Sequence, residues 1–287
     1  MKAFEHPLGV IGAGTMGIGI AQAAAQAGYE VLLYDLSEET QKRALGSLRE
    51  RLERQEQAGK RPAGESAAVI RRIRPINELE QLAQAVLVIE AVPEEMALKQ
   101  ELFAQVERVV SDSCVLASNT SSLPITALAG KLERPERMVG LHFFNPVPSM
   151  RLVEVIEGLR TGERALWLAS LFAESLGKTT VSCQDTPGFL VNRVARSFYG
   201  EALRLLQEGV ADVETIDRLA MEEGRFRMGP FRLMDLIGID VNLAVSQSLY
   251  EATFGEPRYR PNPVQARLVQ AGALGRKAGR GFYRYDD

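Results

Sequence analysis

The chain has 287 residues, of which 46% are hydrophobic and 25% charged, so it can bury a full core without a metal or disulfide staple. Its 34 basic and 37 acidic residues give a net charge of −3 (34 − 37), which argues against a nucleic-acid partner. Two histidines and two distant cysteines, Cys114 and Cys183, leave few soft ligands, so we expect no metal site and two buried free thiols.

No leader-like N-terminus and no apolar run of about 18 residues is found, so we expect a cytoplasmic protein that does not contact a membrane. Strands are expected at short apolar runs, at 8–11, 30–35, 85–92, 114–119, 138–143, 152–156 and 179–183. Helices are expected between the early strands, at 14–28, in the charged segment 37–73 and at 94–110. This order predicts an α/β fold with a doubly wound sheet that is parallel at least in its first half.

The charged segment 37–73 is typical of a solvated helical hairpin, because Gly59, Pro62 and Gly64 interrupt its helical pattern. After Cys183 the strand patterns end, and helices are expected at 186–209, 212–224, 231–253 and 263–275, the third one broken at Gly238. We therefore predict two domains, 1–185 with the helical arm at about 37–73 and an all-helical domain over 186–287. The apolar surplus of the second domain predicts a homodimer that forms through it.

The motif "VIGAGTMG" places Gly12, Gly14 and Gly17 in a GxGxxG spacing directly after a strand and at the start of a helix. Gly12 permits the tight turn, Gly14 lets the backbone approach a pyrophosphate, and Gly17 lets helix and strand pack closely. Asp35 ends the second strand, where a carboxylate binds the ribose 2′-hydroxyl and repels a 2′-phosphate. The motif therefore predicts a Rossmann-type NAD site.

Polar residues stand at the ends of later strands. Ser121 follows the strand at 114–119, and His142 lies near the end of the strand at 138–143. Ligands of open α/β sheets gather at this edge. Pro146 and Pro148 can turn the chain so that the strand with Glu154 runs back beside His142. A carboxylate inside "LVEVI" would usually face solvent, but facing inward it needs a partner, and His142 is the nearest candidate. Such a pair makes a general base for a hydroxyl proton.

The motifs "GAGTMG", "SNTSSLPIT", "GLHFFNPVPSMRLVEVI", "DTPGFLVNR", "MGPFRLMDLIGID" and "GRKAGRGFYRY" together resemble the L-3-hydroxyacyl-CoA dehydrogenase family, including its short bacterial 3-hydroxybutyryl-CoA members. The resemblance runs nearly end to end. It implies a Rossmann-type domain followed by a helical dimerisation domain, a catalytic dyad of His142 and Glu154, and substrate contacts from Ser121 and Asn192. It places the NAD contacts on Gly12, Gly14, Thr15, Met16, Gly17, Asp35, Glu94, Lys99, Ser121 and Asn145.

The resemblance weakens in residues 45–75, where the family has an arm that contacts CoA. This chain offers Arg51, Arg54, Lys60 and Arg61, whose positive charges could meet the CoA phosphates. The alternative is an ordinary solvated helix face.

The resulting hypothesis is that the protein catalyses NAD-dependent oxidation of an (S)-3-hydroxyacyl-CoA to a 3-ketoacyl-CoA. Two alternative functions stay open. One is a dehydrogenase of a free hydroxy acid or sugar acid, and the other is a non-catalytic dinucleotide-binding protein. Dehydrogenases with a lysine base are rejected, because the segment after residue 187 has no lysine before Lys277.

Overall fold

The computed structural model describes residues 4–285. The chain divides into two compact units, the first ending at Thr186 and the second beginning at Pro187. No helix in residues 4–285 is long and apolar enough to cross a bilayer. Within the same range, no group of three His, Cys, Asp or Glu side chains is arranged to hold a metal ion.

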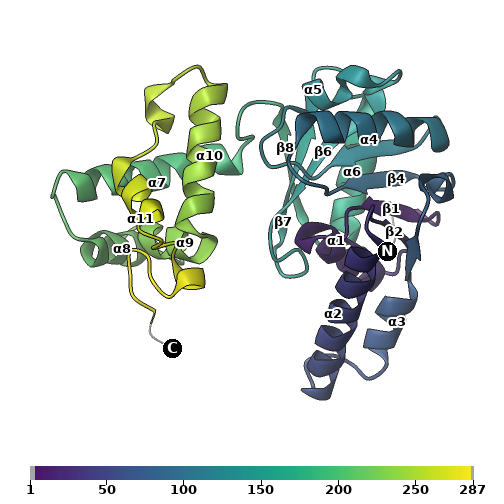
Figure 1. Ribbon diagram of the computed structural model, residues 1–287, viewed down its shortest axis with the longest axis horizontal. Helices are drawn as coiled ribbons and strands as arrows, with labels where there is room; N and C mark the ends of the chain where they lie inside the picture. The colour runs from purple at the N-terminus through teal and green to yellow at the C-terminus, as the bar shows by residue number, and fades with distance from the viewer. Residues whose placement is uncertain (1–3, 286–287) are drawn as a thin grey trace. The chain divides into compact units, whose positions relative to one another are not determined.

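The first unit is built on one mixed sheet, whose strands lie in the order β3-β2-β1-β4-β5-β6-β7-β8 (Figure 1). The strands are β1 Leu8–Ile11, β2 Val31–Tyr34, β3 Ile73–Ile76, β4 Leu87–Glu90, β5 Val115–Ser118, β6 Met138–Phe143, β7 Leu152–Glu157 and β8 Thr179–Gln184. The first six strands in this order, β3 through β6, pair in parallel. Strand β7 pairs antiparallel with β6, and β8 pairs in parallel with β7. The predicted doubly wound sheet is confirmed.

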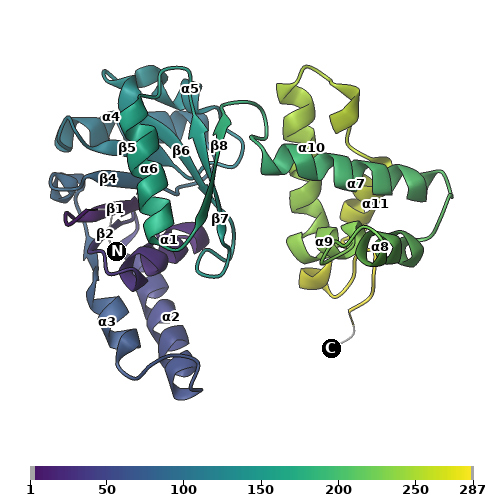
Figure 2. The ribbon, with the colours of Figure 1, turned by 180° about the vertical axis from the view of Figure 1, so that it is seen from behind.

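Helices cover both faces of this sheet. They are α1 Thr15–Gln26, α2 Glu38–Gln57, α3 Glu65–Arg71, α4 Met96–Val109, α5 Ile125–Leu128 and α6 Glu163–Ser175. Figure 1 shows α4 over one face, and Figure 2 shows α6 across the opposite face. Leucine, valine and isoleucine side chains of the central strands are fully buried between these layers, as expected for parallel strands with both faces covered.

The predicted helical hairpin is the pair α2 and α3, which lie side by side and project from the sheet (Figure 1). Ser37 caps α2 through its hydroxyl, which accepts a hydrogen bond from the Thr40 N–H. The buried Gln41 amide donates to the Leu33 and Ile76 carbonyls, so it ties the first turn of α2 to β2 and β3.

The second unit contains α7 Val191–Gln207, α8 Val213–Glu222, α9 Pro230–Ile237, α10 Ile239–Ala252 and α11 Pro263–Gln270. Gly238, at φ +105°, separates α9 from α10, as predicted. The Asp212 side chain caps α8 by accepting a hydrogen bond from the Thr215 N–H. Only isolated β-bridges occur in its described residues, which confirms the all-helical prediction. Asp235 is fully buried and accepts hydrogen bonds from Phe282 N, Tyr283 N and the Tyr285 hydroxyl, so it anchors the "GFYRY" segment.

Several predictions need correction. Strand β3 and helix α6 were not expected, and helix α7 begins at Val191 rather than near residue 186 because the loop before it holds Phe189 at φ 48°. Cys114 is buried, but Cys183 is only half-buried, because β8 is the edge strand of the sheet.

Candidate active site

The loop between β1 and α1 has the shape that a dinucleotide requires. Gly12 is at φ +100°, and a Cβ on Gly17 would lie 1.8 Å from the Gly12 carbonyl oxygen, so both positions require glycine. A Cβ on Gly14 would meet nothing within 4 Å, which leaves the backbone open on that side. Gly14 is also the N-cap of α1, so no side chain satisfies the first N–H groups of that helix. These N–H groups fit a pyrophosphate, so the loop fits NAD.

Asp35 lies at the end of β2, directly beside this loop. Its carboxylate accepts hydrogen bonds from Ala13 N at 2.7 Å and from Ser37 N at 2.9 Å. The structure therefore brings Asp35 to the loop of Gly12, Gly14, Thr15, Met16 and Gly17, in the position for a ribose hydroxyl.

The strand carrying Glu154 runs antiparallel to the strand carrying His142, and the two residues face each other in register. His142 Nδ1 lies 2.6 Å from Glu154 Oε2. Glu154 is 0% exposed and His142 is 6% exposed. The prolines after β6 therefore do turn the chain as predicted, and the carboxylate faces inward with the imidazole as its partner.

Ser121 lies just past the end of β5, the strand next to β6, within a network centred on Glu94. Glu94 Oε1 accepts hydrogen bonds from the Thr120 hydroxyl at 2.6 Å and from Ser121 N at 2.9 Å, and it lies 3.3 Å from Ser121 Oγ. Burial favours a higher pKa for Glu94, but the Thr120 hydrogen bond and the Lys99 charge outweigh it, and the pKa is lowered. Glu94 thus stays ionised and holds the loop of Ser121.

Lys99 is joined to this network through Glu94. Its Nζ lies 3.2 Å from Glu94 Oε2 and 2.6 Å from Glu90 Oε1, and its side chain is 1% exposed. Glu90 also accepts a hydrogen bond from the Ser118 hydroxyl at 2.6 Å. Burial raises the pKa of Glu90, although Lys99 opposes the shift.

The sequence reasoning missed Glu90, although the signal was present: like Glu154, it is a carboxylate in a buried apolar strand. It missed Asn119 as well, whose Oδ1 accepts a hydrogen bond from Phe143 N at 2.8 Å and so joins the ends of β5 and β6. Both residues help to fix the edge of the sheet on which Ser121 and His142 lie.

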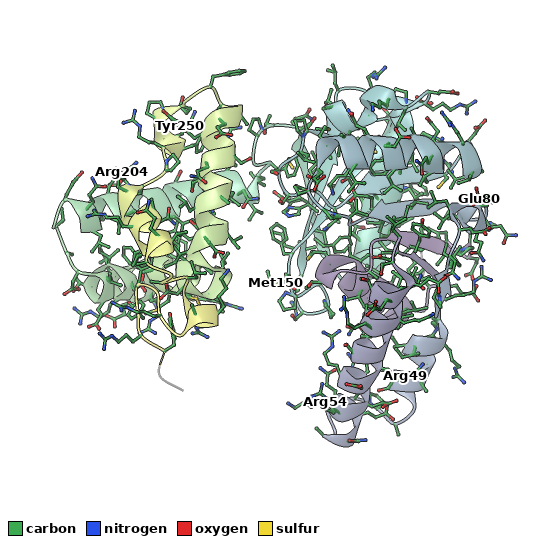
Figure 3. The ribbon with its side chains drawn as sticks, in the orientation of Figure 1. Arg49, Arg54, Glu80, Met150, Arg204 and Tyr250 are labelled. Carbon is green, nitrogen blue, oxygen red and sulfur yellow. The ribbon has the colours of Figure 1, made fainter. Side chains whose placement is uncertain are left out.

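A hollow of about 470 Å³ separates the nucleotide loop from α2. Its lining includes Gly14 and Thr15 on one side and Arg43, Arg51 and Arg54 on the other. Arg51 Nη2 donates to the buried Gln22 Oε1 at 2.6 Å, so its guanidinium is held in place. Figure 3 shows Arg54 toward the projecting end of α2.

The other two arm candidates lie differently. Lys60 is exposed beyond the end of α2 and does not line this hollow, and Arg61 is engaged by Gln55 and Glu65. Arg43, which the sequence reasoning missed, lines the hollow instead.

Two further predicted residues are located here only by their place in the secondary structure. Asn145 is exposed and lies two residues beyond the end of β6. Asn192 lies in the first turn of α7, in the second unit.

Comparison with known proteins covers nearly the whole chain. The family model of the 3-hydroxyacyl-CoA dehydrogenase NAD-binding domain matches residues 7–186, and that of the C-terminal domain of the same enzymes matches residues 188–285. A probable 3-hydroxybutyryl-CoA dehydrogenase of Bacillus subtilis is 45% identical over 97% of this chain and 96% of its own length. The 3-hydroxyadipyl-CoA dehydrogenase of Escherichia coli is 47% identical over 96% of this chain, which spans 58% of that longer protein.

Comparison with solved structures finds the same kind of enzyme. An (S)-3-hydroxybutyryl-CoA dehydrogenase of Ralstonia eutropha superposes with a TM-score of 0.92 at 38% identity, covering 99% of this chain and 100% of that one. Both halves of the chain therefore match the two halves of one enzyme architecture, with the glycine loop and Asp35 in the NAD-binding half. The chain belongs to the 3-hydroxyacyl-CoA dehydrogenase family and is an NAD-dependent oxidoreductase.

Proposed function

We propose that the protein catalyses the reversible oxidation of (S)-3-hydroxyacyl-CoA thioesters, including 3-hydroxybutyryl-CoA, to 3-ketoacyl-CoA. The observation that carries the proposal is the buried contact of 2.6 Å between His142 Nδ1 and Glu154 Oε2. The names of the relatives supply the acyl-CoA class, and the residues supply the chemistry.

The carboxylate of Glu154 fixes the imidazole with its proton on Nδ1. Nε2 of His142 is then the nitrogen that takes the hydroxyl proton of the substrate. Bound NAD supplies the hydride acceptor, so the C3–H electron pair leaves as hydride while the C3–O bond becomes a carbonyl. The proton rests on His142 and returns to the oxygen in the reverse reaction.

Ser121 holds the oxygen at C3, and Glu94 positions Ser121 through the loop that follows β5. Asn192 remains a proposed contact for the same end of the substrate, as the resemblance implies. Asp35 and the loop at Gly12–Gly17 hold the adenosine and pyrophosphate parts of NAD, and Glu94 and Asn145 are kept as proposed contacts nearer the nicotinamide. Lys99, also expected there, is buried, so its proposed role is to act on the cofactor through Glu94.

The arm is proposed to bind the phosphates of CoA. Arg51 and Arg54 carry this proposal, because both line the hollow beside the nucleotide loop. Lys60 lies outside that lining, so its proposed contact with CoA rests on the resemblance and its charge alone.

A homodimer through the second unit is proposed from its surface. An apolar depression of about 630 Å³ is lined by residues such as Val194, Phe198 and Phe226. Val194 is 64% exposed and Phe226 is 53% exposed, and large apolar surfaces of this kind usually mark interfaces. Sedimentation of the Val194→Glu variant tests the proposed dimer, because a charge added to its apolar interface should convert the dimer to monomers. A dimeric mass that is unchanged in this variant would rule out the depression as the interface.

The catalytic test compares three variants with acetoacetyl-CoA and NADH. His142→Gln and Glu154→Gln should each lower kcat by about 10²–10⁴-fold while NADH still binds. Glu157→Gln is the matched control, because Glu157 lies on the same strand but accepts its hydrogen bond from Gln184 at the surface, and it should keep full activity. Near-normal turnover by His142→Gln would remove this histidine from the chemistry. Turnover of free hydroxy acids in preference to acyl-CoA would replace the proposed substrate class.

A further inference from the structure

The first helix of the second unit holds a buried cation that has no anionic partner within the described part of the chain. Arg196 is 5% exposed, and its hydrogen bonds all leave from Nη1, to Asn242 O, Asn242 Oδ1 and Ser246 Oγ. The guanidinium carbon of Arg196 lies over the Tyr199 ring, 4.9 Å from its centre. No carboxylate in residues 4–285 pairs with Arg196, and burial lowers its pKa to about 10, so it remains charged at neutral pH.

The surroundings of Arg196 have too few acceptors for their donors. Arg196 Nε and Asn242 Nδ2 are both buried, and neither has a hydrogen-bond partner in the described part of the chain. Gln265 Nε2 donates to Asn242 Oδ1 at 2.8 Å, so that oxygen already serves two donors. A buried guanidinium is normally neutralised by a carboxylate, and an unpaired one is costly to fold around.

Arg196 also lines a cavity of about 330 Å³, between α7 and the segment that contains the short helix η4, Pro257–Tyr259. Arg204, Arg258 and Arg260 contribute further positive charge to its lining. Arg204, labelled in Figure 3, lies two turns beyond Arg196 on α7 and pairs with Glu201, and Arg258 pairs with Glu256. Of the four arginines that line this cavity, Arg196 is therefore the buried one, and it has no carboxylate partner in residues 4–285.

We propose that Arg196 binds a carboxylate at the far end of the acyl chain, so that the enzyme favours dicarboxylic 3-hydroxyacyl-CoA substrates. The inference rests on the proposed function, in which Asn192 contacts the reacting end. Asn192 and Arg196 are four residues apart, so they share one face of α7 with an axial rise of about 6 Å. That span is close to the reach from C3 to the terminal carboxylate of a six-carbon diacid. The Escherichia coli relative is named for such a substrate, 3-hydroxyadipyl-CoA.

The test compares 3-hydroxyadipyl-CoA with 3-hydroxyhexanoyl-CoA, which has the same chain length without the second carboxylate. The unmodified enzyme should show kcat/KM about 10- to 100-fold higher for the adipyl substrate, as expected for one charge-assisted hydrogen-bonded pair. Arg196→Gln should lose that preference and keep its hexanoyl activity, and Arg196→Lys should retain part of the preference. Arg218→Gln is the control, because it removes one exposed positive charge from α8, outside the cavity.

The outcomes separate this inference from the proposed function. Turnover of neither thioester would refute the proposed function itself. Turnover of both at equal efficiency by the unmodified enzyme would refute only the role of Arg196. If Arg196→Gln folds poorly, the ratio measured with Arg196→Lys and with the unmodified enzyme decides the question. An Arg196→Gln enzyme that keeps its adipyl preference would overturn the inference, because the preference would then not depend on Arg196. If that variant were also monomeric, the carboxylate bound by Arg196 would belong to a second copy of the chain.

Discussion

Lys99 Nζ lies 2.6 Å from Glu90 Oε1, and neither side chain is more than 1% exposed. The pair sits where β4 leads into α4, and Lys99 also contacts Glu94, which holds the loop of Ser121. One buried ammonium thus links the core of the sheet to the candidate active site.

This pair predicts an asymmetric loss of stability. Lys99→Met leaves the Glu90 carboxylate buried without its cation, so it should lower the free energy of unfolding by about 3–5 kcal/mol. Adding Glu90→Gln to that variant removes the stranded charge and should recover part of the loss. Urea denaturation of the single and double variants measures both effects.

The exposed pair of Lys42 and Glu38 on α2 provides the control. Lys42→Met should change stability by no more than about 0.5 kcal/mol, because exposed pairs contribute little. A Lys99→Met variant as stable as this control would show that the buried pair is dispensable.

Some residues of this site could be predicted from the sequence because the residues around them form a recognisable pattern. The glycine spacing, the prolines after His142 and the isolated carboxylate at Glu154 each have a single structural explanation, so the loop and the antiparallel return were predictable. Glu90 carried the same signal as Glu154 but lies at the end of its strand, where polar residues are common.

Other features depend on contacts that no local pattern reports. Strand β3 has only two buried residues and contains Pro75, which is tolerated because β3 is at the edge of the sheet. The position of Arg196 on an amphipathic helix gave no hint that it is buried, because its neighbours Asn242 and Ser246 come from α10.

The arm predicts a difference between two arginines on one helix. Arg54→Gln should raise the KM for acyl-CoA several-fold, because Arg54 lines the hollow beside the nucleotide loop. Arg49→Gln removes the same charge from an exposed position outside that lining and should leave KM unchanged (Figure 3). Steady-state kinetics with acetoacetyl-CoA measures the difference.

A truncated substrate supplies the second control. An acyl pantetheine thioester lacks the nucleotide phosphates, so its KM should be the same for Arg54→Gln and for the unmodified enzyme. If Arg54→Gln raised the KM for acyl-CoA and the KM for the pantetheine thioester by the same factor, Arg54 would act on the structure of the arm rather than on CoA.

Asp35 predicts the choice of cofactor. Asp35→Ala should raise the KM for NAD by about 10- to 100-fold, because a charged acceptor for the ribose hydroxyls is lost, and should narrow the preference for NAD over NADP. Since Asp35 also accepts the Ala13 N–H, Asp35→Asn keeps an acceptor for the loop and serves as the control for loop disorder. An unchanged ratio of NAD to NADP efficiency in Asp35→Ala would contradict this role.

Cys114 predicts a loss of stability in alkali. Burial raises the pKa of its thiol to about 12. A free thiol in the unfolded chain ionises near pH 8.5. Above that pH the unfolded state loses a proton that the folded state keeps, so the free energy of unfolding falls by about 1.4 kcal/mol per pH unit up to the folded pKa.

Cys114→Ala should therefore show a shallower decline of stability between about pH 9 and 10.5, whatever its stability at pH 7. The slope is the decisive quantity, because the cavity left by the substitution lowers stability equally at every pH. Tyr199, Tyr283 and Tyr285 also have raised pKa values from burial and act in the same direction, but they are common to both proteins and cancel in the difference. Parallel pH profiles for the two proteins would show that the Cys114 thiol ionises without unfolding.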